Sequence, residues 1–147
     1  MLKKCWDDFN LGDKVTTPGI TITDAHLVNW AGLTMDFYSL HMDEEFAKKT
    51  AFGGRIAHGP LIFAMAMGLA GRTDLYDDSI IAWLGVENMR IPTPTRIGDT
   101  ITVEVEIKEK RETKDPSRGI TILKYTIKNQ KNEDVMFFDC LQMMHRR

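Results

Sequence analysis

The side chains best suited to chemistry lie in the polar loop between residues 33 and 43, which contains Asp36 and His41. A carboxylate and an imidazole in one loop can both reach a single water molecule, at about 2.6 to 3.2 Å for each hydrogen bond. One group can then take a proton from the water while the other supplies a proton to the substrate. The loop therefore predicts general acid–base chemistry on water, and it leaves open which group is the base.

A long apolar segment follows this loop, opening at Gly59 and Pro60 and closing at Gly71. Proline is favoured at the first position of a helix, and Gly71 stands where a left-handed cap is expected. Because the segment is apolar on every side, we expect a helix that is buried all round. Its N-terminus should present unpaired N–H groups, so the backbone amide of Gly59 is a candidate for stabilising a negatively charged oxygen.

Strand patterns dominate the C-terminal half of the chain. Residues 101–108 alternate between apolar and polar side chains, which predicts a strand with one face in water. Three further aliphatic segments lie at 80–91, 120–128 and 135–144, and short turns join them, so we expect four strands in an antiparallel meander. The N-terminal part predicts one more strand over 14–23, and short helices from residue 23 or 24 to about 30 and over 43–49.

These elements predict an α+β protein, with an antiparallel sheet of about five strands around one central apolar helix, in a single domain over residues 1–147. The net charge of -2 shows no electrostatic footprint for nucleic acid, and neither a secretory signal nor a membrane-spanning run is visible. Cys5 and Cys140 lack the paired spacing of a disulfide framework or a zinc site, so we expect no metal and a reduced, cytoplasmic setting.

The loop and the segment after it resemble the signature of the MaoC-like family, the R-specific enoyl-CoA hydratases also called hydratase 2. The resemblance covers nearly the whole chain and rests on two blocks in order, with matches at Asp36, Leu40, His41, Asp43, Ala47, Phe52, Ile56, Ala57, His58 and Gly59. The family's usual Asn-Pro is replaced here by Tyr38-Ser39, and the serine that many members carry inside the central helix is absent. These departures leave the reaction type intact and the substrate identity open.

The resemblance implies a hot-dog fold and a reversible syn addition of water to a 2-enoyl-CoA, which gives an R-3-hydroxyacyl-CoA. On this interpretation Asp36 and His41 are the catalytic pair, and the Gly59 amide binds the thioester oxygen. Coenzyme A enters as part of the acyl-CoA substrate, so no separate cofactor is expected. A hot-dog sheet leaves an open edge, which predicts a homodimer.

Three other functions stay open on the sequence. The first is a hydratase or dehydratase for a branched or dicarboxylic enoyl-CoA of the mesaconyl type. The second is a hot-dog thioesterase, and the lack of an acidic or amide side chain on the central helix argues against it. The third is a non-catalytic acyl-CoA-binding protein, and the presence of both Asp36 and His41 argues against that function. His58 is interpreted as orienting the turn into the helix and is left outside the catalytic set. Four basic side chains are candidates for the coenzyme A phosphates, although each is by default a solvated charge: Arg55, Arg90, Arg96 and Lys110.

Overall fold

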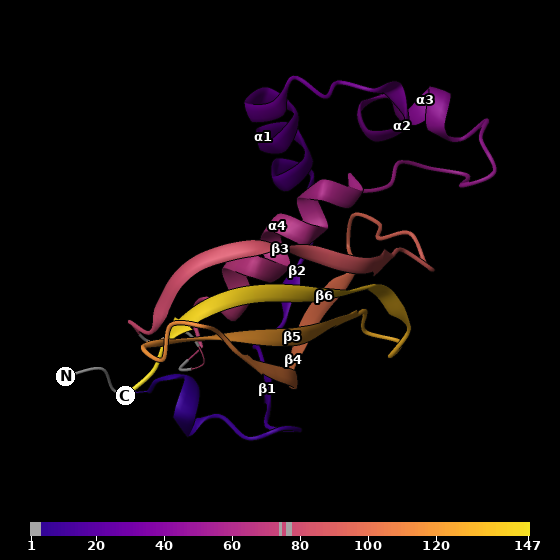
Figure 1. The fold of residues 1–147 in the computed structure, drawn as a ribbon. Helices are drawn as coiled ribbons and strands as arrows, with labels where there is room; N and C mark the ends of the chain where they lie inside the picture. Colours follow the sequence, from indigo (N-terminus) through magenta and orange to yellow (C-terminus); the bar gives the residue numbers. More distant parts are fainter. Residues whose placement is uncertain (1–3, 74, 76–77) are drawn as a thin grey trace.

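The computed structural model describes residues 4–73, 75 and 78–147. Helical elements in these ranges are η1 (Trp6–Asp8), a 3-10 turn, and α1 (Asp24–Thr34), α2 (Ser39–Met42), α3 (Glu44–Ala47) and α4 (Gly59–Ala70). The strands are β1 (Lys14–Thr16), β2 (Ile20–Thr21), β3 (Ile80–Arg90), β4 (Thr100–Glu112), β5 (Arg118–Lys128) and β6 (Asp134–His145). Figure 1 shows the sheet curving around α4, with α1, α2 and α3 gathered beyond one end of that helix.

The strands pair in the order β1-β4-β5-β6-β3, all antiparallel, with β2 also on β4. The four predicted C-terminal strands and their wrapping around one helix are confirmed. The simple meander is wrong in one place, because β3 pairs with β6 instead of β4. The side of β4 that faces away from β5 is taken by β1 and β2, so the connection through Pro92 and Pro94 cannot be a hairpin.

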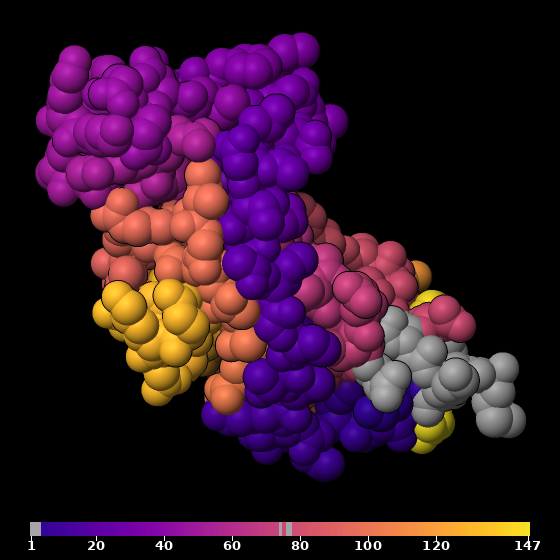
Figure 2. All heavy atoms as spheres, turned by 180° about the vertical axis from the view of Figure 1, so that it is seen from behind, coloured from indigo at the N-terminus to yellow at the C-terminus, as the bar shows by residue number. Residues whose placement is uncertain are grey.

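The predicted N-terminal strand over 14–23 is present as two short pieces on β4. Pro18 and Gly19 separate β1 from β2, and proline has no N–H to give to the sheet. Thr17 keeps the segment attached, since its N–H donates to the Val103 carbonyl at 2.9 Å and its hydroxyl accepts from the Val103 N–H at 3.1 Å. The space-filling view shows this segment as a narrow band running up the back of the molecule to the helical part (Figure 2).

The core lies between the sheet and one face of α4. Strand β4 alternates as predicted, and four of its side chains are almost completely buried: Ile101, Val103, Val105 and Ile107. On the neighbouring strands the Tyr125 and Phe138 rings stack at 4.7 Å, and Phe138 meets Phe63 of α4 edge-on at 5.0 Å. Each fully buried side chain of this size contributes about 1.5–3 kcal/mol, so this layer supplies most of the stability.

Helix α4 is confirmed in type and position, but two expectations about it are wrong. The helix is not buried all round, because the curved sheet covers only one of its faces. The positions of α4 that stay partly or fully exposed include Phe63, Ala64, Met65, Met67 and Gly68. The end at Gly71 is not left-handed, since its φ is -63°; the Thr73 hydroxyl instead donates to the Ala70 carbonyl at 2.7 Å and closes the last turn.

The segment from α1 to the start of α4 forms a helical layer, defined here as residues 24–58. Helix α1 runs beyond its expected end and stops at Met35, whose φ of 64° turns the chain into the polar loop. Helix α3 begins as expected, with the Asp43 carboxylate accepting from the Phe46 N–H at 2.9 Å. The single turn of α2 was not expected. None of the helices in the described ranges is both long enough and apolar enough to cross a membrane.

Candidate functional site

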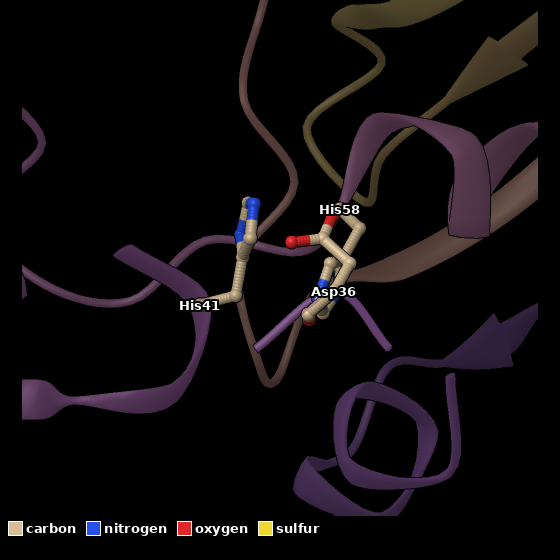
Figure 3. Close-up of side chains that lie close together, drawn as sticks. All are labelled: Asp36, His41 and His58. Atoms are coloured by element: carbon tan, nitrogen blue, oxygen red, sulfur yellow. The ribbon is translucent and has the colours of Figure 1, made fainter. Parts of the chain in front are cut away.

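Three side chains from different parts of the helical layer meet at the N-terminus of α4. Asp36 lies in the loop after α1, His41 in α2, and His58 is the residue that caps α4. One ligand atom from each lies within 4.8 Å of the other two. Figure 3 shows the Asp36 carboxylate pointing toward the His41 ring, with the His58 ring behind it. The pair that the sequence singled out is therefore brought together, and it has a third member.

The hydrogen bond of His41 fixes which of its nitrogens can react. Its Nδ1 lies 2.8 Å from the backbone carbonyl oxygen of Ile56. A carbonyl can only accept, so Nδ1 carries the hydrogen and donates it. In the neutral ring Nε2 is then left with the lone pair, which is the state that a general base requires.

Asp36 is held by its backbone and by one of its carboxylate oxygens. Oδ1 accepts from the Tyr38 N–H at 3.3 Å, and the second carboxylate oxygen has no hydrogen-bond partner among the described residues. The preceding residue, Met35, is in the left-handed region, where a side chain costs roughly 1–2 kcal/mol. The carboxylate therefore sits on a short, strained loop that other contacts must hold in place.

His58 is the site residue that the sequence interpretation left out. Its side chain is fully buried, its Nε2 lies 3.0 Å from the Asp36 carbonyl oxygen, and its ring stacks on His41 with centroids 3.9 Å apart. Burial lowers the pKa of His58 by more than the hydrogen bond to Asp36 raises it, and the adjacent His41 lowers it further. Its signals in the sequence were its match to the family signature and its position next to Gly59, which indicate proximity but not these contacts.

An apolar cavity of about 310 Å³ opens beside His41 and Gly59. The remaining wall is almost entirely apolar, with Thr95 as its single hydroxyl: Phe52, Ile56, Ala57, Ile62, Ile91, Pro92, Pro94, Val135 and Met136. Asp36 does not line this cavity. A Cβ added at Gly59 would lie 2.9 Å from Ile91 Cδ1, so only glycine leaves this wall of the cavity its present shape.

The four basic candidates for phosphate binding lie in different surroundings. Arg55 is held between Asp24 at 2.7 Å and Glu44 at 3.2 Å, and the Arg96 guanidinium donates to the Phe52 carbonyl at 2.6 Å. Arg90 donates to its neighbour Met89 at 2.7 Å. Lys110 lies over the Trp6 ring at 4.0 Å, in a contact that belongs to the N-terminal part of the chain. Arg55, Arg90 and Arg96 each stand next in sequence to a residue that lines the cavity, whereas Lys110 does not.

Within the described residues, Asp36, His41 and His58 are also the one group close enough to share a metal ion. Their geometry does not favour it. The two rings are stacked with an interplanar angle of 29°, which aligns their in-plane lone pairs side by side instead of toward one point. The arrangement fits proton transfer better than metal binding.

Comparison with known proteins identifies relatives of this chain. It is 37% identical over 108 residues to the protein MaoC of Klebsiella aerogenes, covering 74% of this chain and 32% of that protein. It is 38% identical over 90 residues to the (R)-specific enoyl-CoA hydratase of Aeromonas caviae, covering 61% of this chain and 65% of the enzyme. The chain thus spans less than two thirds of the length of both relatives.

Solved structures agree on the fold. A protein from Archaeoglobus described as a monoamine oxidase regulatory protein superposes with a TM-score of 0.93 at 33% identity, covering 98% of this chain and 95% of that one. A Mycobacterium tuberculosis protein described as a double hot-dog fold has a TM-score of 0.86 at 20% identity, covering 98% of this chain and 44% of its own. The predicted hot-dog fold is therefore confirmed. The model of the MaoC-like domain matches residues 8–129, and the chain belongs to this family.

Proposed function

We propose that the chain catalyses the reversible hydration of a 2-enoyl-CoA to an R-3-hydroxyacyl-CoA. The observation that supports this most directly is the position of His41, which stands beside both the Asp36 carboxylate and the apolar cavity that begins at Gly59. The family assignment supports a hydratase or dehydratase chemistry, and the Aeromonas relative is named for this reaction.

The geometry accommodates each step of such a reaction. A water at about 2.6 to 3.2 Å from each of two groups can bridge the pair, because a ring nitrogen of His41 and a carboxylate oxygen of Asp36 lie within 4.8 Å of each other. One group removes a water proton as the oxygen bonds to the β-carbon, and electrons move through the double bond to the thioester oxygen. The other group, which must carry a proton at the start, delivers it to the α-carbon, and the proton taken from the water passes between the two groups to restore it. Between these steps the charged oxygen would be held by the Gly59 N–H at the start of α4.

The cavity favours an apolar acyl group. Its wall contains no charged side chain other than His41, when that ring is protonated. A second carboxylate on the substrate would lose its hydration there without gaining a cationic partner, which is costly. We therefore propose a straight or branched aliphatic enoyl chain and disfavour the dicarboxylic alternative.

A thioesterase is the nearest competing function, because the same pair could direct water to the thioester carbonyl. No acidic or amide side chain projects from α4, whose sequence is apolar throughout. A panel of enoyl-CoAs, read by loss of the conjugated thioester absorbance and by release of free thiol, separates the two reactions. We expect absorbance loss without thiol release, with activity persisting in a chelator since the mechanism needs no metal or added cofactor. Thiol release as the main signal would contradict the hydratase proposal.

We also propose that the chain forms a homodimer through the edge strand β3, which has no neighbour beyond it among the described strands. Large apolar side chains are exposed on it: Ile81, Trp83 and Leu84. Trp83 also shares an open apolar hollow with the uncovered face of α4 at Phe63, Ala64 and Met67. Exposed apolar edges of this kind usually mark a protein interface. Light scattering should give the mass of two chains, and Trp83→Arg should shift it toward one.

Both thiols are free and buried, which is consistent with the proposed cytoplasmic setting.

A further inference from the structure

We propose that His58 is a positioning residue, which holds Asp36 and His41 in register with the N-terminus of α4. The proposal rests on the hydration reaction proposed above and assigns a role to a side chain that takes no part in its proton transfers. It is carried by the contacts of the His58 ring: the bond to the Asp36 carbonyl at 3.0 Å and the stack on His41 at 3.9 Å.

The hydrogen-bond partners of His58 determine its protonation state. Because the Asp36 carbonyl can only accept, Nε2 carries the hydrogen. Nδ1 is buried and has no hydrogen-bond partner in the part of the chain that the structure describes. A second proton there would place an unpaired charged N–H in the interior, beside His41, which burial disfavours. A ring that keeps one proton at Nε2 cannot serve as an acid or base, although it can hold its neighbours.

The bond from His58 to Asp36 joins segments that are 22 residues apart in the chain. On one side of it lies the loop that follows the left-handed Met35, and on the other lies the first turn of α4. A strained loop on the surface of the helical layer would relax without such a link. The same residue precedes Gly59, so one side chain fixes the distance between the carboxylate and the amide proposed to bind the thioester oxygen.

The stack on His41 completes the positioning. His41 donates its Nδ1–H to the carbonyl of Ile56, two residues before His58. The short segment from Ile56 to His58 therefore holds the His41 ring both by this hydrogen bond and by the stack on one ring face. On its other side the ring meets Tyr38 edge-on at 6.0 Å. These contacts leave Nε2 as the nitrogen available to a water held by Asp36.

Two substitutions separate the contacts of His58. His58→Phe keeps an aromatic ring for the stack and removes the donor, whereas His58→Gln loses the ring and keeps an N–H donor that can reach the same carbonyl. Displacing a catalytic group by about 1 Å costs on the order of 100-fold, so His58→Phe should lower kcat by about that factor and leave KM nearly unchanged. His58→Gln should recover most of the loss.

The control is Leu123→Ala, a buried substitution in the sheet, which should lower stability without lowering the kcat of the folded protein. If His58→Phe lowers only the melting temperature, as this control does, His58 is merely structural and the proposal is overturned. If the parent protein hydrates enoyl-CoA and the His58→Phe variant is just as active, the positioning role is overturned and the proposed reaction stays intact.

A measurement on the unsubstituted protein tests the same proposal without activity. Imidazole ¹⁵N spectra should show His58 as the neutral Nε2–H form at neutral pH and after mild acidification. A charged ring or an Nδ1–H form would overturn the proposal, whether or not the variants fold. If His58 has the expected form but the parent protein turns over none of the thioesters, the proposed reaction is overturned. The catalytic role of His58 as a positioning residue then falls with it.

Discussion

The sheet with α4 and the helical layer of residues 24–58 are held together in different ways. Strands β4, β5 and β6 bury a continuous series of aliphatic and aromatic side chains against α4. The helical layer buries few, mainly Leu27, Ala31 and Ala47 of its helices. Several of its large apolar side chains are exposed: Leu33, Met35, Phe37, Tyr38, Phe46 and Phe52. The candidate site lies where this sparsely packed layer meets the well-packed core.

Polar contacts hold the helical layer together, whereas apolar burial holds the sheet together. Arg55 joins α1 to α3 by its ion pairs with Asp24 and Glu44. His41 and His58 donate to carbonyls of segments remote in sequence. Hydrogen bonds are directional and apolar contacts are not, so the layer can hold a geometry for chemistry while contributing little stability. Substitutions in the two regions should therefore separate activity from stability.

The largest effect is expected at the catalytic pair. Asp36→Asn and His41→Ala should each reduce turnover of an enoyl-CoA by about 100 to 10,000-fold, because each removes one acid–base group. If the two share one water they act as a unit, so the double variant should be little worse than the poorer single variant. Turnover is measured with the enoyl-CoA that the panel selects.

Thermal stability and acyl-CoA affinity of the three variants provide the control. Both should stay near the parental values, because neither side chain belongs to the core. Folded variants that keep turnover within a few-fold of the parent would show that the loop is structural, and the hydratase assignment would fail.

Sequence patterns predicted the sheet far better than the layer that carries the chemistry. The alternation of residues 101–108 was sufficient for β4, because burial on one face of a strand is a local, periodic property. The side-by-side placement of β3 and β6 depends on β1 and β2 occupying another edge, which no local pattern encodes. The contacts of His58 with Asp36 and His41 depend likewise on the three-dimensional path of the chain. Asp36, His41 and Gly59 were singled out by residue type and position together with the family resemblance, and their proposed roles stay predictions.

The next largest effect is expected at Gly59. A side chain there would meet Ile91 Cδ1, a flexible group that can move, and would enter the cavity at the place proposed for the thioester. Gly59→Val should therefore fold and lose up to about 100 to 1,000-fold in turnover, the usual contribution of one oxyanion donor. Gly32→Ala is the matched control in the helical layer, because a Cβ there meets nothing within 4 Å. Equal turnover in the two variants would remove the oxyanion role of Gly59.

A substitution in the sheet should give the opposite result. Leu123 is buried in β5 and is paired with Cys140 of β6. The cavity is lined by Met136, which lies nearer the start of β6, so Leu123 is not part of the cavity wall. Leu123→Ala should cost about 2–5 kcal/mol in the free energy of unfolding, from lost burial and the cavity left behind, while turnover of the folded fraction is kept. Lys124→Ala, on the exposed face of the same strand, should change stability by only about 0.5 kcal/mol. Urea unfolding monitored by circular dichroism measures both variants.

A further, small effect on stability alone is expected from the titration of the His58 ring, and it appears only on acidification. The pKa of the buried ring is lowered by its burial, whereas in the unfolded chain a histidine titrates at about 6.5. Below about 6.5 the unfolded state therefore binds a proton that the folded state refuses, and unfolding becomes progressively more favourable until the pH reaches the lowered pKa. The stability that His58 contributes through this difference is complete above about 6.5 and is lost as the pH falls. His58→Gln lacks a titrating group, so its free energy of unfolding should decline less steeply than the parental value over this interval.

Urea unfolding at a series of pH values compares the two proteins, and carboxylate titrations common to both cancel in the difference. Parallel curves would mean that His58 has the same pKa in both states, contrary to a ring that stays neutral because it is buried between Asp36 and His41.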